Sequence, residues 1–179
     1  MDNNTQLQIN TSKSQTKQKV VDQLKLYISN QGFEIEEQNI NKPWGAYFRL
    51  LRSDTKNFIQ KYFNLDQKAI ENLLQYNLDP KFLLVAPNKK LSWQYHFNRS
   101  EMWTVLVGPV KVITSNNDIE KNKRILQSGQ NIKIPPTERH RLIGLENWGI
   151  VAEIWVHTNT NTPSNENDIV RVQDDFGRT

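Results

Sequence analysis

The order of hydrophobic and polar positions predicts a helical first part of the chain. Residues 1–16 are rich in Asn, Gln, Ser, Thr and Lys, offer almost nothing to bury, and are expected to form a disordered tail. Between 17 and 31 apolar residues recur at the spacing of one helix face; they are Val20, Val21, Leu24, Tyr27 and Ile28. Gly32 follows at the place of a helix C-terminal cap. We therefore predict a helix over 17–31.

A second helical block follows a short β-type stretch. Residues 33–37 alternate as a strand does, and the sequence Lys-Pro-Trp-Gly at 42–45 indicates a turn before a further apolar strand. Apolar residues return to helical spacing between 55 and 77, and Asp66 lies where it would cap a second helix. We interpret 53–80 as a helical insertion.

After Pro80 the pattern changes to short apolar or alternating runs with turn residues between them. These runs are 82–86, 91–97, 101–107, 110–114, 131–134, 140–143 and 149–156. Short strands at this spacing are typical of a compact antiparallel barrel or sandwich. The sequence thus predicts one mainly β domain over 17–179, with its barrel at 82–157 and a C-terminal extension at 158–179.

Composition narrows the chemistry that this domain can support. The chain has no Cys, which excludes disulfides and thiolate metal sites, and only three His residues are available as ligands. The net charge of +4 comes with no compact basic helix and no aromatic-basic motif, so no nucleic-acid partner is expected. The N-terminus lacks the apolar core of a signal peptide and no apolar run is of membrane-spanning length. We therefore expect no membrane partner and a cytoplasmic location.

Two of the histidines point to a metal site. In the run 91–97, strand alternation places Gln94 and His96 on one face and the aromatic residues on the other. Glu101 opens the next run, and His140 starts a later strand after a short turn. Two imidazoles, one carboxylate and one amide oxygen suit one divalent ion, with zinc preferred and iron, manganese or nickel as alternatives.

The spacing of these residues resembles that of the cupin motifs. The first cupin motif has two ligands two residues apart, then a Glu, then a Gly; it is matched by Gln94, His96, Glu101 and Gly108. The second has a Gly, a Pro and a His, and it is matched by Gly129, Pro135 and His140. The resemblance implies a cupin double-stranded β-helix, which is a jelly-roll barrel, here with N-terminal and inserted helices. It also implies that Gln94, His96, Glu101 and His140 hold the metal.

A closer resemblance, from residue 42 onward, is to the C-terminal cupin of type II mannose-6-phosphate isomerases. The matching segments are Lys-Pro-Trp-Gly at 42–45, Leu-Ser-Trp-Gln-Tyr-His at 91–96, Arg-Ser-Glu-Met-Trp at 99–103, His-Arg-Leu at 140–142, and the Asp-Ile-Val-Arg and Asp-Phe-Gly-Arg segments at 168–171 and 175–178. Two positions depart from the family pattern: Met102 stands where a second His is usual, and Thr137 replaces a Gly.

This resemblance implies a metal-dependent aldose–ketose isomerase that acts on a small phosphorylated sugar through a cis-enediol. Such a reaction needs a proton carrier and cations for the phosphate. Glu138, two residues before His140, is the candidate proton carrier, and Arg99 is the second catalytic candidate. The candidate substrate-binding cations are Lys42, Arg99, Arg141 and Arg178. Cupin barrels often pair through a sheet face, which implies a homodimer.

Two other functions fit the same residues. His96, Glu101 and His140 also form the 2-His-1-carboxylate set of non-haem Fe(II) dioxygenases, although Gln94 would then fill a position needed by oxygen or substrate. Alternatively, the protein is a cupin that binds a sugar or a sugar nucleotide without turnover. The helices either pack over the barrel or cover its mouth as a lid, and His157, beyond the barrel strands, is expected at the surface.

Overall fold

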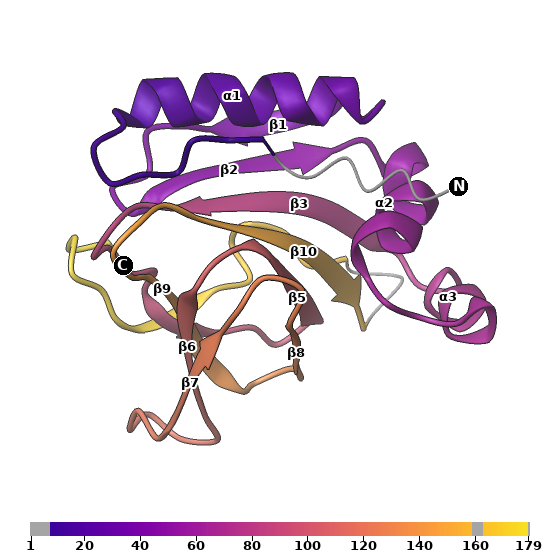
Figure 1. Ribbon diagram of the computed structural model, residues 1–179. Coiled ribbons are helices and arrows are strands. Elements are labelled where there is room, and N and C mark those ends of the chain that lie inside the picture. The colour runs from indigo at the N-terminus through magenta and orange to yellow at the C-terminus, as the bar shows by residue number, and fades with distance from the viewer. Residues whose placement is uncertain (1–7, 159–162, 179) are drawn as a thin grey trace.

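The structure, a computed structural model, describes residues 8–158 and 163–178 and consists mainly of two antiparallel sheets (Figure 1). The six-stranded sheet has the order β1 (Ile35–Asn39), β2 (Gly45–Leu50), β3 (Leu78–Val85), β10 (Gly149–His157), β5 (Arg99–Val107) and β8 (Asn131–Ile134). The five-stranded sheet has the order β11 (Val170–Gln173), β4 (Trp93–Tyr95), β9 (Arg139–Gly144), β6 (Val110–Ser115) and β7 (Asn122–Leu126). The arrangement is the predicted jelly roll of a cupin.

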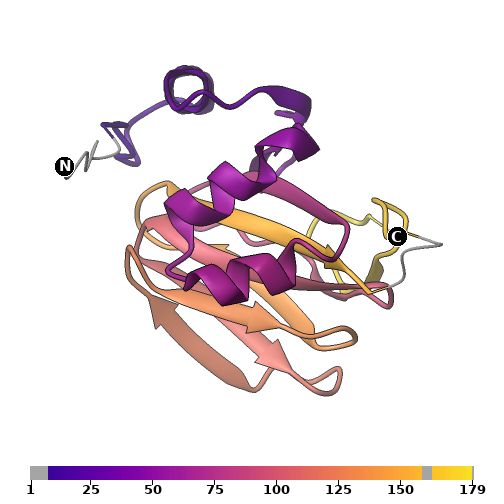
Figure 2. The same ribbon diagram turned by 90° about the vertical axis from the view of Figure 1, so that its right-hand side faces the viewer.

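The helices cover the outer face of the six-stranded sheet (Figure 2). They are α1 (Lys17–Asn30), the 3₁₀ turn η1 (Arg52–Asp54), α2 (Thr55–Tyr62) and α3 (Gln67–Leu73). Thr16 caps α1 by accepting from the backbone N–H of Lys19, and Asp66 caps α3 in the same way through Ala69. Gly32, at φ +79°, follows α1 in the left-handed conformation that the sequence predicted for a C-terminal cap.

Strand alternation gives the six-stranded sheet two different cores. On β3, Phe82 and Leu84 face the helices, whereas Leu83 and Val85 face the interior between the sheets. Lys81 shares the inward face with Leu83, so a charged side chain is carried into the barrel. The same alternation on β10 places Val151 inside and Ala152 outside. Strands whose sequences are mostly apolar therefore place some polar side chains in the interior of the barrel.

The structure differs from the sequence predictions at several places. Residues 8–16 were expected in the disordered tail, but Thr11 accepts a backbone hydrogen bond from Trp148 (2.9 Å); residues 1–7 lie outside the described ones. The helical insertion predicted at 53–80 ends before residue 78, because strand β3 begins there and its residues are buried in the sheet. Strand β7 was not predicted, since its first four residues are exposed and mostly polar at the sheet edge.

Two further expectations are settled by burial. His157 is fully buried rather than exposed, because β10 continues to that residue and its Nε2 lies 2.8 Å from Asp79 Oδ2. The helices act as packing elements over the outer core and not as a lid. Within residues 8–158 and 163–178, no helix combines the length and apolar character needed to cross a membrane.

Phe58 of α2 tests how much the helical layer contributes to stability. Its fully buried ring packs edge-on against Phe82 of β3, with centroids 5.1 Å apart. Phe58→Ala should lower the free energy of unfolding by about 3–5 kcal/mol, measured by urea denaturation, because it removes apolar contacts and leaves a cavity. Leu26→Ala, on the exposed face of α1, is the control and should change stability by less than about 0.5 kcal/mol. Equal effects of the two substitutions would contradict this packing role.

Candidate metal centre and cavity

Three of the four predicted metal ligands converge inside the barrel. His96 directly follows the end of β4, Glu101 lies on β5, and His140 lies on β9. His96 Nε2 is 3.2 Å from Glu101 Oε1, and His140 Nε2 is 3.4 Å from Glu101 Oε2. One donor atom from each residue lies within 4.8 Å of the other two, and all three residues are buried. The carboxylate thus stands between the two imidazoles, each of which presents Nε2 to it.

Backbone carbonyls fix the orientation of both imidazole rings. His96 Nδ1 lies 2.5 Å from the carbonyl oxygen of Asp168, and His140 Nδ1 lies 2.9 Å from that of Glu138. A carbonyl only accepts, so these contacts assign the ring proton to Nδ1 and leave the Nε2 lone pairs directed at Glu101. This outer shell is the usual support of metal-binding histidines.

Burial and neighbouring charge set the ionisation of the centre. Burial, with help from nearby Arg99 and His140, lowers the pKa of His96 to about 3, so its ring is neutral. Burial by itself raises the pKa of the Glu101 carboxyl, but the Arg99 guanidinium, whose Nε lies 3.0 Å from Glu101 Oε1, favours the ionised form, and that pKa is lowered. A neutral imidazole and an ionised carboxylate are the forms in which these side chains bind metals.

The buried donors fit a divalent cation. Glu101 Oε2 and His140 Nε2 are buried and have no hydrogen-bond partner among the described residues. Such unsatisfied atoms are costly, and a metal ion between them would satisfy both. The donor set suits several first-row divalent metals and does not distinguish among them.

Gln94 and Arg99 stand beside the three donors but face them differently. The Gln94 Oε1 accepts from Ser92 Oγ at 2.5 Å, and its amide nitrogen faces His96 Nε2 at 3.5 Å. The amide would therefore have to turn over before its oxygen could bind a metal. Arg99 donates from Nε to Glu101 Oε1 and from Nη2 to His96 Nε2, each at 3.0 Å. The Arg99 guanidinium and a bound metal would therefore compete for the same two atoms, Glu101 Oε1 and His96 Nε2.

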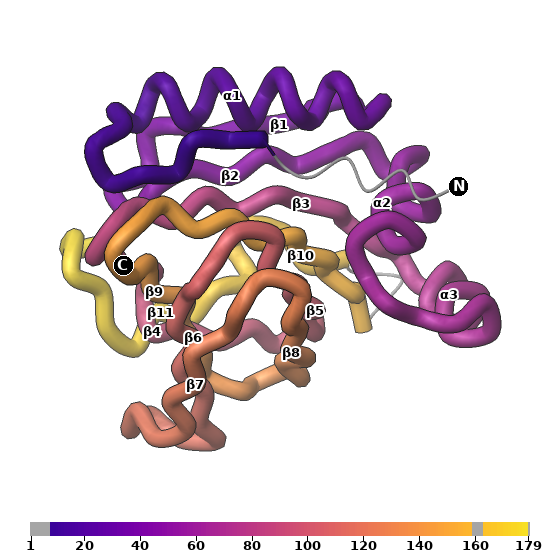
Figure 3. The backbone as a smooth tube through the Cα atoms, in the orientation of Figure 1, coloured from indigo at the N-terminus to yellow at the C-terminus, as the bar shows by residue number. Residues whose placement is uncertain are grey.

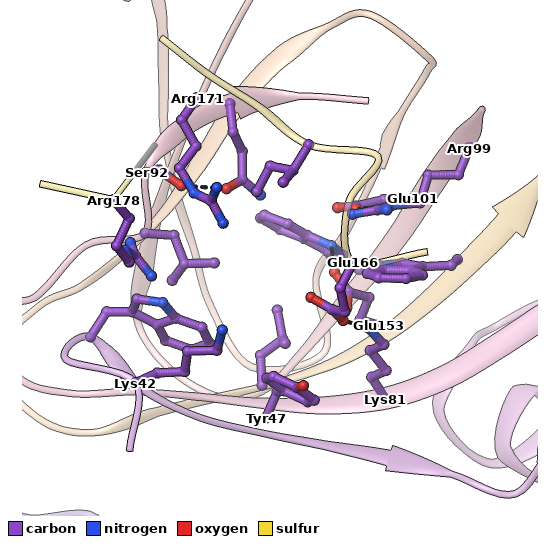
Figure 4. A pocket seen from close by; sticks show the side chains of 17 residues that line it. Lys42, Tyr47, Lys81, Ser92, Arg99, Glu101, Glu153, Glu166, Arg171 and Arg178 are labelled. Atoms are coloured by element: carbon purple, nitrogen blue, oxygen red, sulfur yellow. Dashed lines mark hydrogen bonds and ion pairs between the residues drawn. The ribbon is translucent and has the colours of Figure 1, made fainter. Parts of the chain in front are cut away.

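A cavity of about 550 Å³, including its open mouth, adjoins this centre (Figure 4). Its charged lining consists of Lys42, Lys81, Arg99, Glu101, Glu153, Glu166, Arg171 and Arg178. Its aromatic lining consists of Trp44, Tyr47, Trp103 and Trp155. The concentration of charge in this lining favours a polar and ionic ligand over an apolar one.

Lys42, Trp44 and Tyr47 reach the cavity from the Lys-Pro-Trp-Gly turn and β2. Gly45 stands at φ +151°, and a Cβ there would lie 1.8 Å from the carbonyl oxygen of Leu84. Only glycine permits this close approach of the turn to β3. The turn thereby brings Trp44 and Lys42 against the barrel opening.

Three of the four cations predicted to bind substrate line the cavity, and Arg141 does not. Lys42, Arg99 and Arg178 are in its wall, with Arg178 paired to Asp174. Arg141 is 1% exposed and donates to Glu120 Oε1 (2.7 Å) and to the carbonyl of Leu91 (3.1 Å). The structure thus gives Arg141 a packing role between loops, which alternation alone did not reveal.

Glu138 also lies outside the cavity wall. The prediction assumed an extended segment before His140, but Thr137 has φ +67°, which reverses the chain there. The Thr137 N–H donates to the His96 carbonyl at 2.8 Å, which ties the turn to the metal centre. Glu138 contributes its backbone carbonyl to His140 instead of its side chain to the cavity.

The sequence analysis missed two buried charges in the wall of the cavity, Glu153 and Lys81. Glu153 Oε1 accepts from Trp103 Nε1 at 2.9 Å, and burial together with the Glu101 charge raises its pKa to about 8. Lys81 Nζ lies 2.8 Å from Glu166 Oε1 and 3.1 Å from the centroid of the Trp155 ring. Each is a charged residue within a predominantly apolar strand, and this was the feature of the sequence that could have indicated them.

The C-terminal extension forms one side of the cavity. Strand β11 pairs with β4 (Figure 3), and Asp168 just before it accepts from the backbone N–H groups of Phe97 and Asn98, both at 3.0 Å. Arg99 Nη1 donates to Ser164 Oγ at 2.8 Å. The segment is therefore held at the rim by the turn between His96 and Glu101, two of the candidate metal ligands.

Sequence relatives contain a domain similar to this chain. Residues 62–174 match the profile of a family described as mannose-6-phosphate isomerase C-terminal. The chain is 27% identical over 169 residues to a mannose-1-phosphate guanylyltransferase from Salmonella montevideo, covering 94% of this chain and 29% of that protein. It is 34% identical over 98 residues to a mannose-1-phosphate guanylyltransferase from Escherichia coli K12, covering 55% and 19%. The chain spans less than a third of the length of these relatives.

Solved structures support the fold at low sequence identity. Vicilin from hazelnut (Corylus avellana) is 17% identical and matches with a TM-score of 0.52 over 79% of this chain and 36% of that one. The capsular polysaccharide assembling protein CapF from Staphylococcus aureus is 12% identical, with a TM-score of 0.50 over 77% and 34%. Together with the profile match over most of the barrel, these findings show that the chain belongs to the mannose-6-phosphate isomerase C-terminal family and has a cupin fold.

Proposed function

We propose that this protein is a metal-dependent isomerase that interconverts the aldose and ketose forms of a phosphorylated sugar such as mannose 6-phosphate. The observation that carries the proposal is one cavity that joins a metal-type donor set to a buried acid, Glu153, and to several cations. Family membership supports a substrate from sugar metabolism.

The reaction needs a group that removes the proton from C2 of the aldose and returns it to C1. Glu153 is suited to this because its pKa of about 8 lets it accept and release a proton near neutral pH. Trp103 orients its carboxyl by donating to Oε1. His96, Glu101 and His140 would hold a metal that supplies a Lewis acid for the negative charge that develops on the substrate.

Other cavity residues would bind and orient the sugar. Trp155 lines the wall, is 5% exposed, and its buried indole N–H has no hydrogen-bond partner in the part of the chain that the structure describes. A ligand hydroxyl or phosphate oxygen would satisfy that donor. Arg99 and Lys42 supply positive charge for the enediolate or the phosphate. Zinc is the metal we favour, with iron, manganese and nickel as alternatives, and a homodimer stays a prediction from the fold.

A sugar-binding protein without turnover is the second candidate. The position of the Arg99 guanidinium favours this candidate. It is hydrogen-bonded to His96 Nε2 and Glu101 Oε1, the atoms that a catalytic metal would need, and so competes with the metal. Binding of mannose 6-phosphate without production of fructose 6-phosphate would select this candidate. An Fe(II) dioxygenase would instead require iron and consume oxygen, so an anaerobic assay separates it from an isomerase.

The metal centre is tested by substituting one histidine. His140→Ala should abolish stoichiometric metal, because the Glu101–His96 pair alone offers too few donors. Metal content is measured by mass spectrometry after loading with zinc, iron, manganese or nickel. His157→Asn is the control, since that histidine is equally buried but bonds Asp79, and it should keep the metal. Full metal content in His140→Ala would refute the centre.

The proton carrier is tested by a pair of Glu→Gln substitutions. Glu153→Gln should lower kcat for mannose 6-phosphate by roughly 10²- to 10⁴-fold, because the amide cannot carry the proton. Its metal content should stay stoichiometric, since Glu153 is not among the converging donors. Glu138→Gln is the matched control and should keep wild-type kcat. Loss of kcat in Glu138→Gln with wild-type kcat in Glu153→Gln would identify Glu138 as the proton carrier. Wild-type kcat in both variants would exclude both residues as the proton carrier.

A further inference from the structure

The ion pair between Lys81 and Glu166 joins a buried cation to an exposed carboxylate. The side chain of Lys81 is 2% exposed, whereas that of Glu166 is 51% exposed and comes from the loop 163–168 at the cavity rim. A lysine rarely stays charged in such a place without an anion beside it. Figure 4 shows Glu166 pointing from the loop into the cavity toward Lys81.

Two further cations, Arg99 and Lys42, favour the ionised form of the same carboxylate. The ammonium groups of Lys42 and Lys81 lie 5.5 and 5.2 Å from the centroid of one ring, that of Tyr47. The Arg99 guanidinium lies over the Trp155 ring at 3.4 Å, and Lys81 lies over that ring too. Burial alone would raise the pKa of Glu166, but Lys81, Arg99 and Lys42 outweigh it and lower that pKa. The geometry and the charge both describe an anion-binding site.

We propose that Glu166 is an internal occupant of an anion subsite built by Lys81 and Lys42, and that the phosphate of a sugar phosphate replaces it. The inference rests on the proposed function for the choice of a phosphorylated sugar. It adds the residues that bind the phosphate and a carboxylate that competes with it.

A phosphate monoester is suited to displace the carboxylate. It carries close to two negative charges at neutral pH and three acceptor oxygens, so it offers these cations more charge and more acceptors than the carboxylate that it would replace. Half of the Glu166 side chain already contacts solvent, so water can solvate its carboxylate once the phosphate has replaced it. Asp168 and Ser164 keep their own bonds to Phe97, Asn98 and Arg99, so only the turn around Glu166 must move.

The test is isothermal titration of the metal-loaded protein with inorganic phosphate, mannose 6-phosphate and mannose. Glu166→Gln should bind both phosphate ligands roughly tenfold more tightly than wild type, since the competing charge is gone while the side-chain shape is kept. Lys81→Met should weaken both by a similar factor or more. Mannose, which has no phosphate, should be unaffected by either substitution.

Glu146→Gln is the matched control. Glu146 pairs with Lys13 at the same 2.8 Å, but both side chains are exposed and neither lines the cavity. The substitution changes net charge equally and should leave phosphate affinity at the wild-type value. An equal gain in Glu146→Gln would show a general charge effect and overturn the proposal.

Two outcomes with Glu166→Gln would also overturn it. Unchanged affinity would mean that the carboxylate does not occupy the subsite, and weaker affinity would mean that it helps to hold the ligand. These comparisons do not require turnover. Tighter phosphate binding in a protein without isomerase activity would retain the subsite and reject the enzyme, whereas activity with unchanged affinity would do the reverse.

Discussion

The Arg99 guanidinium connects the parts of the site to one another. It donates to Glu101 and His96 in the metal centre and to Ser164 in the C-terminal extension. Its plane also stacks over Trp155, so the cation is 4% exposed and held on several sides. A buried guanidinium is tolerated only when its donors are used in this way. The position of the C-terminal extension and the ionised state of Glu101 both depend on it.

Alternation along β5 explains why one departure from the family pattern leaves the metal centre intact. Glu101 and Trp103 point into the barrel, and Met102 between them packs in the outer core under the helices. A histidine at this position would face that outer layer, so its absence removes no donor from the centre. The second departure, Thr137, stands at φ +67°, a conformation that glycine adopts more easily. This turn therefore carries local backbone strain next to His140.

The sequence was informative where residues recur at fixed spacing. Helical periodicity located α1, α2 and α3, and the motif spacing brought together His96, Glu101 and His140. The roles of residues whose position depends on loop geometry could not be predicted from such spacing. Alternation was extrapolated through a turn to Glu138, although the left-handed Thr137 breaks it.

Long-range pairing was the other limit of the sequence analysis. Arg141 is buried by Glu120 and Leu91, and no local pattern indicates these partners. Glu166 is 85 residues from Lys81, so their pairing appears only in the folded chain. Glu153 and Lys81 were visible as charges within apolar strands, yet their inward direction followed only from the pairing of β3 with β10, where they stand opposite each other.

The interior charges explain why a metal and an anionic ligand would suit this barrel together. The raised pKa of Glu153 keeps it largely protonated at neutral pH, and the lowered pKa values of Glu101 and Glu166 keep them ionised. Lys81 and Arg99 then balance these two carboxylates. A divalent cation at Glu101 adds positive charge, and replacement of Glu166 by a phosphate adds negative charge. In a cavity that screens charge poorly, each change would lower the electrostatic cost of the other, so occupation of the two proposed sites would be coupled by their charge.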